Sequence, residues 1–255
     1  MGAVVLTAHE LLKSTYLPKK IDCDKALALM LDIAQDIAGT YELVEKYLEA
    51  QEVAIRNLDP KIRKDRSVMV PAIGNVEVRC KEFLQKSDHA LRNLFKVVKL
   101  FYTDVGNGGW ESLKTKIENG RQDIDNFSQF LDNALPLLQL VRNTRNCVEH
   151  PRQDQRIEVV DFSIDAANNL LPPMIEIVHP KTPGDKMPVA DFIVQISKNI
   201  VGVVELMMVF LCARHVQSAS GFPVQVVEIP LDRRRSSNVR YGYGLTNGND
   251  IIPMS

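Results

Sequence analysis

Three residues that suit phosphate chemistry occur within the six-residue segment "RNCVEH": Arg145, Asn146 and His150. An arginine presents a planar fork of N–H donors to phosphate oxygens, and an amide both donates and accepts hydrogen bonds. A histidine takes up or releases a proton near neutral pH. Together these groups suit cleavage of an RNA phosphodiester, in which the 2′-hydroxyl is the nucleophile, the histidine moves the proton and the arginine stabilises the charge on phosphorus.

The segment lies at the end of an apolar helical pattern that we expect to run from Gln122 to Glu149. At 100° per residue, one stripe of this helix is apolar and contains Phe127, Leu131, Ala134, Leu138 and Val141. Arg145 falls on the same stripe, five turns after Phe127. Because a buried guanidinium is costly unless it is paired, we expect Arg145 in a groove near the helix end rather than in solvent. Pro151 ends the helix and leaves His150 free to turn toward Arg145.

The same residues have a purely structural interpretation. In that alternative, His150 caps an ordinary helix C-terminus and Arg145 pairs with a carboxylate. The sequence leaves both interpretations open.

"RNCVEH" resembles the motif of the HEPN superfamily, an arginine followed after four to six residues by a histidine, often with asparagine next to the arginine. The resemblance covers about Asp22–Gln217. It implies a compact helical bundle in which Arg145 and His150 are catalytic and Asn146 positions them. It also implies a homodimer whose two motifs face each other across one cleft, and a role in toxin–antitoxin or phage-defence systems.

From the residues and the resemblance together we expect a metal-independent endoribonuclease without cofactors. Arg142 and Arg152, which flank the motif, are the expected substrate-binding residues, and RNA is the expected substrate. An antitoxin or a protein of a defence complex is a possible partner. The alternative is a non-enzymatic module of the same fold that binds a protein or RNA. A nucleotide-gated regulatory domain is a third possibility, for which the sequence shows no motif.

The fold class expected is mainly α, a HEPN-like bundle of four long helices with a small β insertion and a C-terminal β hairpin. The expected helices are Asp22–Asn57, Asn75–Asp104, a short Trp110–Glu118, Gln122–Glu149 and Val189–Val216. Short runs rich in β-branched residues predict strands within Arg156–Ile164 and Met174–Pro180. After the last helix, Phe222–Pro230 and Asn238–Leu245, the second of which alternates apolar residues, predict a hairpin, and all four strands could share one sheet.

Two regions are expected. Residues 1–217 would form the helical domain, with the β insertion at about 155–180, and residues 218–255 a hairpin and a loosely ordered tail packed on it. The apolar stretch "IVGVVELMMVFLCA" is too short for a membrane span, so we expect a buried core helix and no membrane partner.

The overall composition is that of a soluble globular protein, with 45% hydrophobic and 25% charged residues. A net charge of -1 means that any phosphate-binding surface must be local.

The four cysteines lack zinc-site spacing and are expected to be reduced in a cytoplasmic protein, with no metal site. "RRRSSNVRYGY" (Arg233–Tyr243) could contact RNA but more simply forms a solvated hairpin turn, and "KIRKDR" (Lys61–Arg66) is expected to be a solvated loop.

Overall fold

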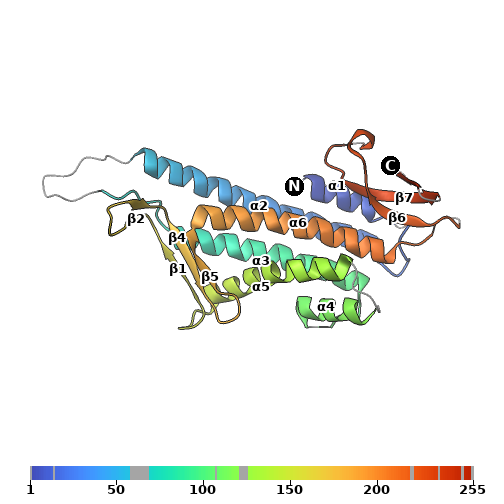
Figure 1. Ribbon diagram of the computed structural model, residues 1–255, viewed down its shortest axis with the longest axis horizontal. Helices are drawn as coiled ribbons and strands as arrows, with labels where there is room; N and C mark the ends of the chain where they lie inside the picture. The colour runs from blue at the N-terminus through green and yellow to red at the C-terminus, as the bar shows by residue number, and fades with distance from the viewer. Residues whose placement is uncertain are drawn as a thin grey trace. The chain divides into compact units, whose positions relative to one another are not determined.

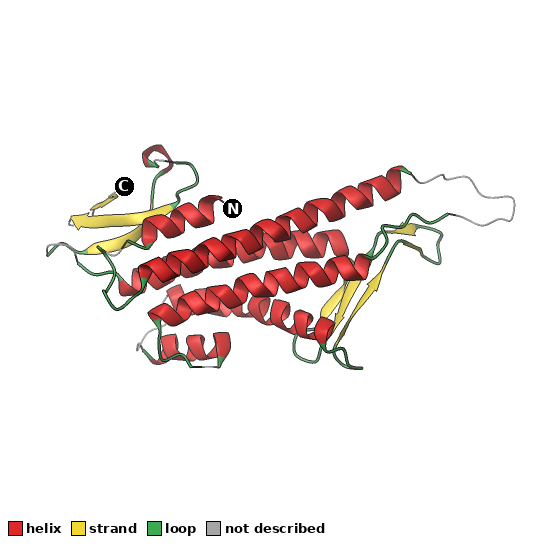
Figure 2. Cartoon of the chain, turned by 180° about the vertical axis from the view of Figure 1, so that it is seen from behind, coloured by secondary structure: helices red, strands yellow, loops and turns green. Residues whose placement is uncertain are grey.

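The computed structural model describes residues 2–13, 15–57, 69–106, 108–120, 126–218, 221–234, 236–247 and 250–253. These residues are mainly helical, as Figure 2 shows in red, with small sheets. The described α-helices are α1 (Gly2–Leu11), α2 (Cys23–Arg56), α3 (Val76–Phe101), α4 (Gly109–Asn119), α5 (Asn126–Glu149) and α6 (Val189–His215), labelled in Figure 1. A 3-10 turn covers Leu231–Arg233.

The four long helices and the short α4 confirm the sequence predictions to within a few residues. Asp22 caps α2 as expected, because its Oδ1 accepts a hydrogen bond from the backbone N–H of Lys25 at 2.9 Å. The helix α1 was not predicted. It is only ten residues long, and its nearly uniform apolar composition gives no clear helical stripe. Its end is held by Tyr243, whose hydroxyl donates to the Leu11 carbonyl at 2.5 Å.

The strands form three separate sheets, so the expectation of a single shared sheet is wrong. One sheet has the order β1-β4-β5, the second pairs β2 with β3, and the third has the order β6-β7-β8. All described pairings are antiparallel. The strands are β1 (Arg156–Val160), β2 (Ser163–Ile164), β3 (Leu170–Leu171), β4 (Met174–Val178), β5 (Gly184–Pro188), β6 (Val224–Glu228), β7 (Tyr241–Asn247) and β8 (Asp250–Pro253).

Asp161 explains why the predicted strand Arg156–Ile164 divides between two sheets. Its Oδ2 accepts hydrogen bonds from the backbone N–H groups of Ile73 and Gly74, each at 3.1 Å, and its Oδ1 accepts one from Phe162 at 2.8 Å. These bonds attach the end of β1 to the segment before α3 and end the β1–β4 pairing there. The β6–β7 hairpin confirms the C-terminal prediction, whereas the predicted loose tail contains β8, paired with β7.

Contacts divide the chain into two compact units, each built from parts of the four long helices. The first comprises Met1–Ile37, His89–Leu135 and Ile200–Ser255, and the second Ala38–Asp88 and Pro136–Asn199. The first contains α1, α4 and the β6-β7-β8 sheet; the second contains the other two sheets. The division into residues 1–217 and 218–255 stays a prediction.

The helix α6 is the one described helix that is long and apolar enough, by length and composition, to cross a membrane. Within its most apolar window, 56% of the helix is buried inside the protein. The prediction that this stretch is too short for a membrane span is therefore wrong for α6 as a whole. Core helices of soluble proteins pass the same test, and the burial of α6 agrees with the predicted core helix.

Cys80, buried in α3, gives the stability of the protein a definite pH dependence. Burial, aided by the Glu77 carboxylate, raises the pKa of the Cys80 thiol from near 9 to about 12. Above pH 9 the unfolded chain releases this proton while the native state keeps it, so the free energy of unfolding falls as the pH rises from 9 toward 12. Between about pH 8 and about pH 10.5, we expect the free energy of unfolding, measured with urea, to fall more for the wild type than for Cys80→Ala. Equal losses in the two proteins would contradict this.

Candidate functional site at the end of α5

The helix α5 places Arg145 at the margin of the core, as its sequence pattern predicts. The side chains of the predicted stripe are all buried: Phe127, Leu131, Ala134, Leu138 and Val141. Arg145 continues this stripe, and its side chain is 23% exposed. The helix ends at Glu149, directly before His150 and Pro151. The expectation that Arg145 does not extend into solvent is therefore confirmed.

Each nitrogen of the Arg145 guanidinium faces a different oxygen. Its Nε lies 3.6 Å from Oδ2 of Asp88, its Nη1 donates to Oδ1 of Asn146 at 3.3 Å, and its Nη2 lies 2.5 Å from Oε2 of Glu149. The structural alternative for Arg145, pairing with a carboxylate, is thus present in the molecule. The charge of the guanidinium is balanced by two acids of different exposure.

Asp88 is the inner of the two acids. It belongs to α3, and its side chain is 7% exposed. It lies four residues after Leu84 and three before Leu91, on the same face of α3 as these two buried leucines. Asp88 therefore occupies a core position of this helix. A carboxylate at such a position is stabilised by a nearby cation, and Arg145 supplies one.

Glu149 is the outer acid and lies four residues after Arg145 on the same helix. Its side chain is 25% exposed, so water reaches it more readily than it reaches Asp88. Pairs at this spacing on a helix surface contribute only about 0.3–0.5 kcal/mol. The two ion pairs of Arg145 therefore differ in how easily they can open.

His150 lies one residue beyond α5 and is exposed. Its backbone N–H donates to the Asn146 carbonyl at 2.8 Å and so extends the last helical turn. Among the described residues its imidazole has no hydrogen-bond or ion-pair partner, including Arg145. The expected turn of His150 toward Arg145 is therefore not observed, and both ring nitrogens remain accessible to a ligand.

The hairpin β4–β5 fixes the end of α5. The buried Cys147 thiol lies 3.8 Å from the Val178 carbonyl, and the Asn143 amide donates to the Thr182 hydroxyl at 3.1 Å. His179 accepts a hydrogen bond at Nδ1 from the Thr182 backbone at 3.1 Å, which stabilises the turn that carries Thr182. The β insertion, which the sequence could not connect to the motif, thus holds the helix end that carries it.

The two predicted substrate-binding residues are both exposed. Arg142 lies one turn before Arg145 and Asn146 on α5, and Arg152 lies just beyond the helix, where its backbone pairs with Gln155. The structure therefore leaves both side chains exposed to solvent. Their binding role stays a prediction.

Asp88 and Glu149 are the residues that sequence reasoning missed. The position of Glu149, four residues after Arg145, is a signal that local spacing provides. The signal for Asp88 is an acid within the apolar stripe of α3, although only the folded chain shows which cation it pairs with.

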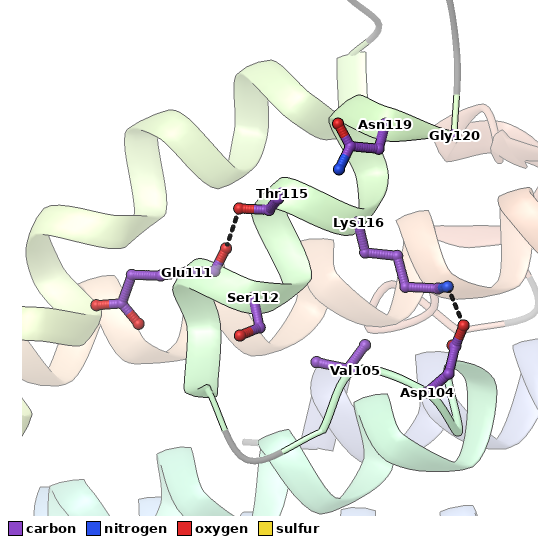
Figure 3. Close-up of a pocket in the computed structure, with 8 residues that line it drawn as sticks. All are labelled: Asp104, Val105, Glu111, Ser112, Thr115, Lys116, Asn119 and Gly120. Atoms are coloured by element: carbon purple, nitrogen blue, oxygen red, sulfur yellow. Dashed lines mark hydrogen bonds and ion pairs between the residues drawn. The ribbon is translucent and has the colours of Figure 1, made fainter.

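Other candidates gain little from the structure. An open pocket of about 560 Å³ beside α4 is lined by partly exposed polar groups such as Lys116, which pairs with Asp104 (Figure 3). None of the predicted site residues lines it. No group of three or more potential metal ligands occurs among the described residues.

Of the two basic segments singled out in the sequence, the structure describes most of Arg233–Tyr243 but not Lys61–Arg66. In Arg233–Tyr243, Arg233 is exposed, but Arg234 donates to the Ile229 carbonyl and Arg240 pairs with the buried Glu205 at 3.3 Å. Arg234 therefore has a structural contact within the hairpin, and Arg240 has one with α6. Arg235 and Lys61–Arg66 lie outside the described residues.

Comparisons of this chain with family models, with curated protein sequences and with solved structures found no significant match. The resemblance to HEPN proteins therefore rests on "RNCVEH" and its position at a helix end.

Proposed function

We propose that the protein is a metal-independent endoribonuclease of HEPN type that acts in the cytoplasm as part of a toxin–antitoxin or phage-defence system. The observation that carries this proposal is the end of α5, where a guanidinium beside a buried carboxylate is followed by an exposed histidine whose imidazole has no partner in the described part of the chain. The four long helices agree with the expected helical bundle, whereas the resemblance does not account for the β segment between α5 and α6.

The proposed reaction needs only groups of the protein and of RNA. The 2′-oxygen attacks phosphorus and loses its proton to a base, while the bond from phosphorus to the 5′-oxygen breaks and that oxygen receives a proton. Arg145 stabilises the additional negative charge on the phosphate oxygens, and His150 carries one of the two proton transfers. Asn146, hydrogen-bonded to Arg145, keeps the guanidinium in place. The products end in a 2′,3′-cyclic phosphate and a 5′-hydroxyl.

Chelation provides the first test of this reaction. Since no step uses a divalent cation, we expect EDTA to leave the rate of RNA cleavage unchanged and the products to carry 2′,3′-cyclic phosphates. Denaturing gels with end-group analysis by mass spectrometry check both points. Activity that appears only after magnesium or manganese is added would overturn the proposal.

A homodimer is the second expectation. The proposed site contains one histidine per chain, His150, whereas the reaction needs two proton transfers, so a symmetric pair of sites would provide the second group. We expect analytical ultracentrifugation at micromolar concentration to show a dimer. A monomer with full cleavage activity under the same conditions would contradict the composite site.

A non-enzymatic protein-binding or RNA-binding module is the second candidate. The double pairing of Arg145 with Asp88 and Glu149 favours it, because both acids reduce the attraction of this arginine for phosphate. Under this alternative the purified protein binds a partner without cleaving RNA, and Arg145→Ala affects its stability alone.

A further inference from the structure

The two acids beside Arg145 meet different nitrogens of its guanidinium. Asp88, the more buried acid, lies at Nε, and Glu149, the more exposed acid, lies at Nη2. Each guanidinium nitrogen carries its own N–H donors, so the contact at Nε can persist while the contact at Nη2 exchanges its partner. Asn146 occupies the third nitrogen, Nη1.

The energetic difference between the two contacts determines which one can exchange. Asp88 is 7% exposed, so separating it from Arg145 would leave a carboxylate and a guanidinium poorly solvated. Glu149 is 25% exposed and lies at the helix end, so its carboxylate can rotate into water at little cost. A phosphate oxygen that replaces it gains a charge-assisted contact with the same nitrogen, Nη2.

We infer that Asp88 is the positioning residue of this site and that Glu149 occupies, in the free protein, the position at Nη2 of Arg145 that receives the RNA phosphate. The inference rests on the proposed function, because it assigns roles within the same cleavage site. Glu149 then competes with substrate, whereas Asp88 keeps the guanidinium oriented throughout the reaction. Substrate binding releases Glu149 to solvent and leaves the Arg145–Asp88 pair intact.

Glu149→Gln separates this role from a purely structural one. The amide retains the shape of the side chain but removes the competing charge, so phosphate binds more tightly. We expect the KM for RNA and the Kd for a fluorescent 2′-O-methyl oligoribonucleotide, which lacks the nucleophile, to fall about two- to fivefold, with kcat little changed. The effect diminishes as salt concentration rises.

The matched control is Glu52→Gln in α2. Glu52 also forms an ion pair with an arginine of its own helix, Arg56, at an N–O distance of 2.5 Å. Unlike the Arg145–Glu149 pair, both side chains are 70% exposed. The substitution changes the net charge by the same amount, so a general gain in attraction for RNA would appear in both variants. Only Glu149→Gln is expected to tighten binding.

Asp88→Asn tests the positioning role. We expect kcat per folded molecule to fall at least about tenfold, because the amide no longer holds the guanidinium by charge. The folded fraction is determined by circular dichroism in the same preparation. If kcat per folded molecule stays at the wild-type value, Asp88 has a structural role only and that part of the inference is wrong.

The cleavage and binding experiments distinguish failure of the inference from failure of the proposed function. If the wild type cleaves RNA but Glu149→Gln leaves both KM and Kd unchanged, the role of Glu149 is wrong and the ribonuclease proposal stands. If the wild type cleaves no RNA but Glu149→Gln still tightens oligonucleotide binding relative to Glu52→Gln, the phosphate position is supported and the ribonuclease proposal fails. Absence of both cleavage and binding overturns both.

Discussion

His150→Ala is expected to reduce the rate of RNA cleavage by about 10²–10⁴, the usual contribution of a group that transfers a proton in the transition state. The same change should leave the free energy of unfolding nearly unaltered. His150 is exposed, lies beyond the last residue of α5, and has no described partner for its imidazole. Its backbone hydrogen bond to Asn146 does not depend on the side chain. Single-turnover cleavage and thermal unfolding measure the two effects.

His9→Ala is the matched control for this prediction. His9 is an exposed histidine of α1, so its replacement removes an identical group from a surface helix. We expect His9→Ala to cleave RNA at the wild-type rate. If His150→Ala also cleaves at that rate, the exposed histidine at the end of α5 has no catalytic role.

Arg145→Lys is expected to lose about 10²–10³ in cleavage rate, the typical cost of losing a donor that stabilises charge in the transition state. Lysine keeps the positive charge near the buried Asp88, but its ammonium cannot contact three oxygens through a planar fork. The loss should appear mainly in kcat. Arg145→Ala removes the charge as well and should also lower the free energy of unfolding, because it removes a cation beside the buried Asp88.

Arg56→Lys, in the exposed pair with Glu52, controls for the general effect of exchanging a paired arginine. Urea unfolding of all three variants shows whether lost activity follows lost structure. Full activity in a folded Arg145→Lys protein would show that the planar guanidinium is unnecessary, and the proposed role of Arg145 would be wrong.

Helical periodicity predicted the part of the site that belongs to α5. The apolar stripe that ends at Arg145 and the stop at Pro151 are local properties of the sequence, and both appear in the structure. The exposed position of His150 also follows from the helix end. The charge partner Asp88 was not predictable in the same way, because its contact with Arg145 depends on how α3 packs against α5.

The strands show more clearly that contacts between distant parts of the chain could not be predicted from the sequence. Runs of β-branched residues located β1, β4 and β6, and alternation of apolar residues located β7. By contrast, β5 contains Gly184, a lysine and Pro188 and carries no strand signal. Pairing is non-local, so the sequence did not show that three sheets form or that Asp161 divides a predicted strand. The contact of the β4–β5 turn with α5, through Asn143 and Thr182, was hidden for the same reason.

The most direct test of the central claim is the cleavage rate of the Arg145→Ala and His150→Ala double variant against the two single variants, in EDTA and corrected for the folded fraction. If both groups serve one transition state, the double change costs far less than the product of the single effects. The account predicts that result, with each single variant strongly impaired. Wild-type cleavage by both folded single variants would contradict it and leave the end of α5 as a structural helix terminus.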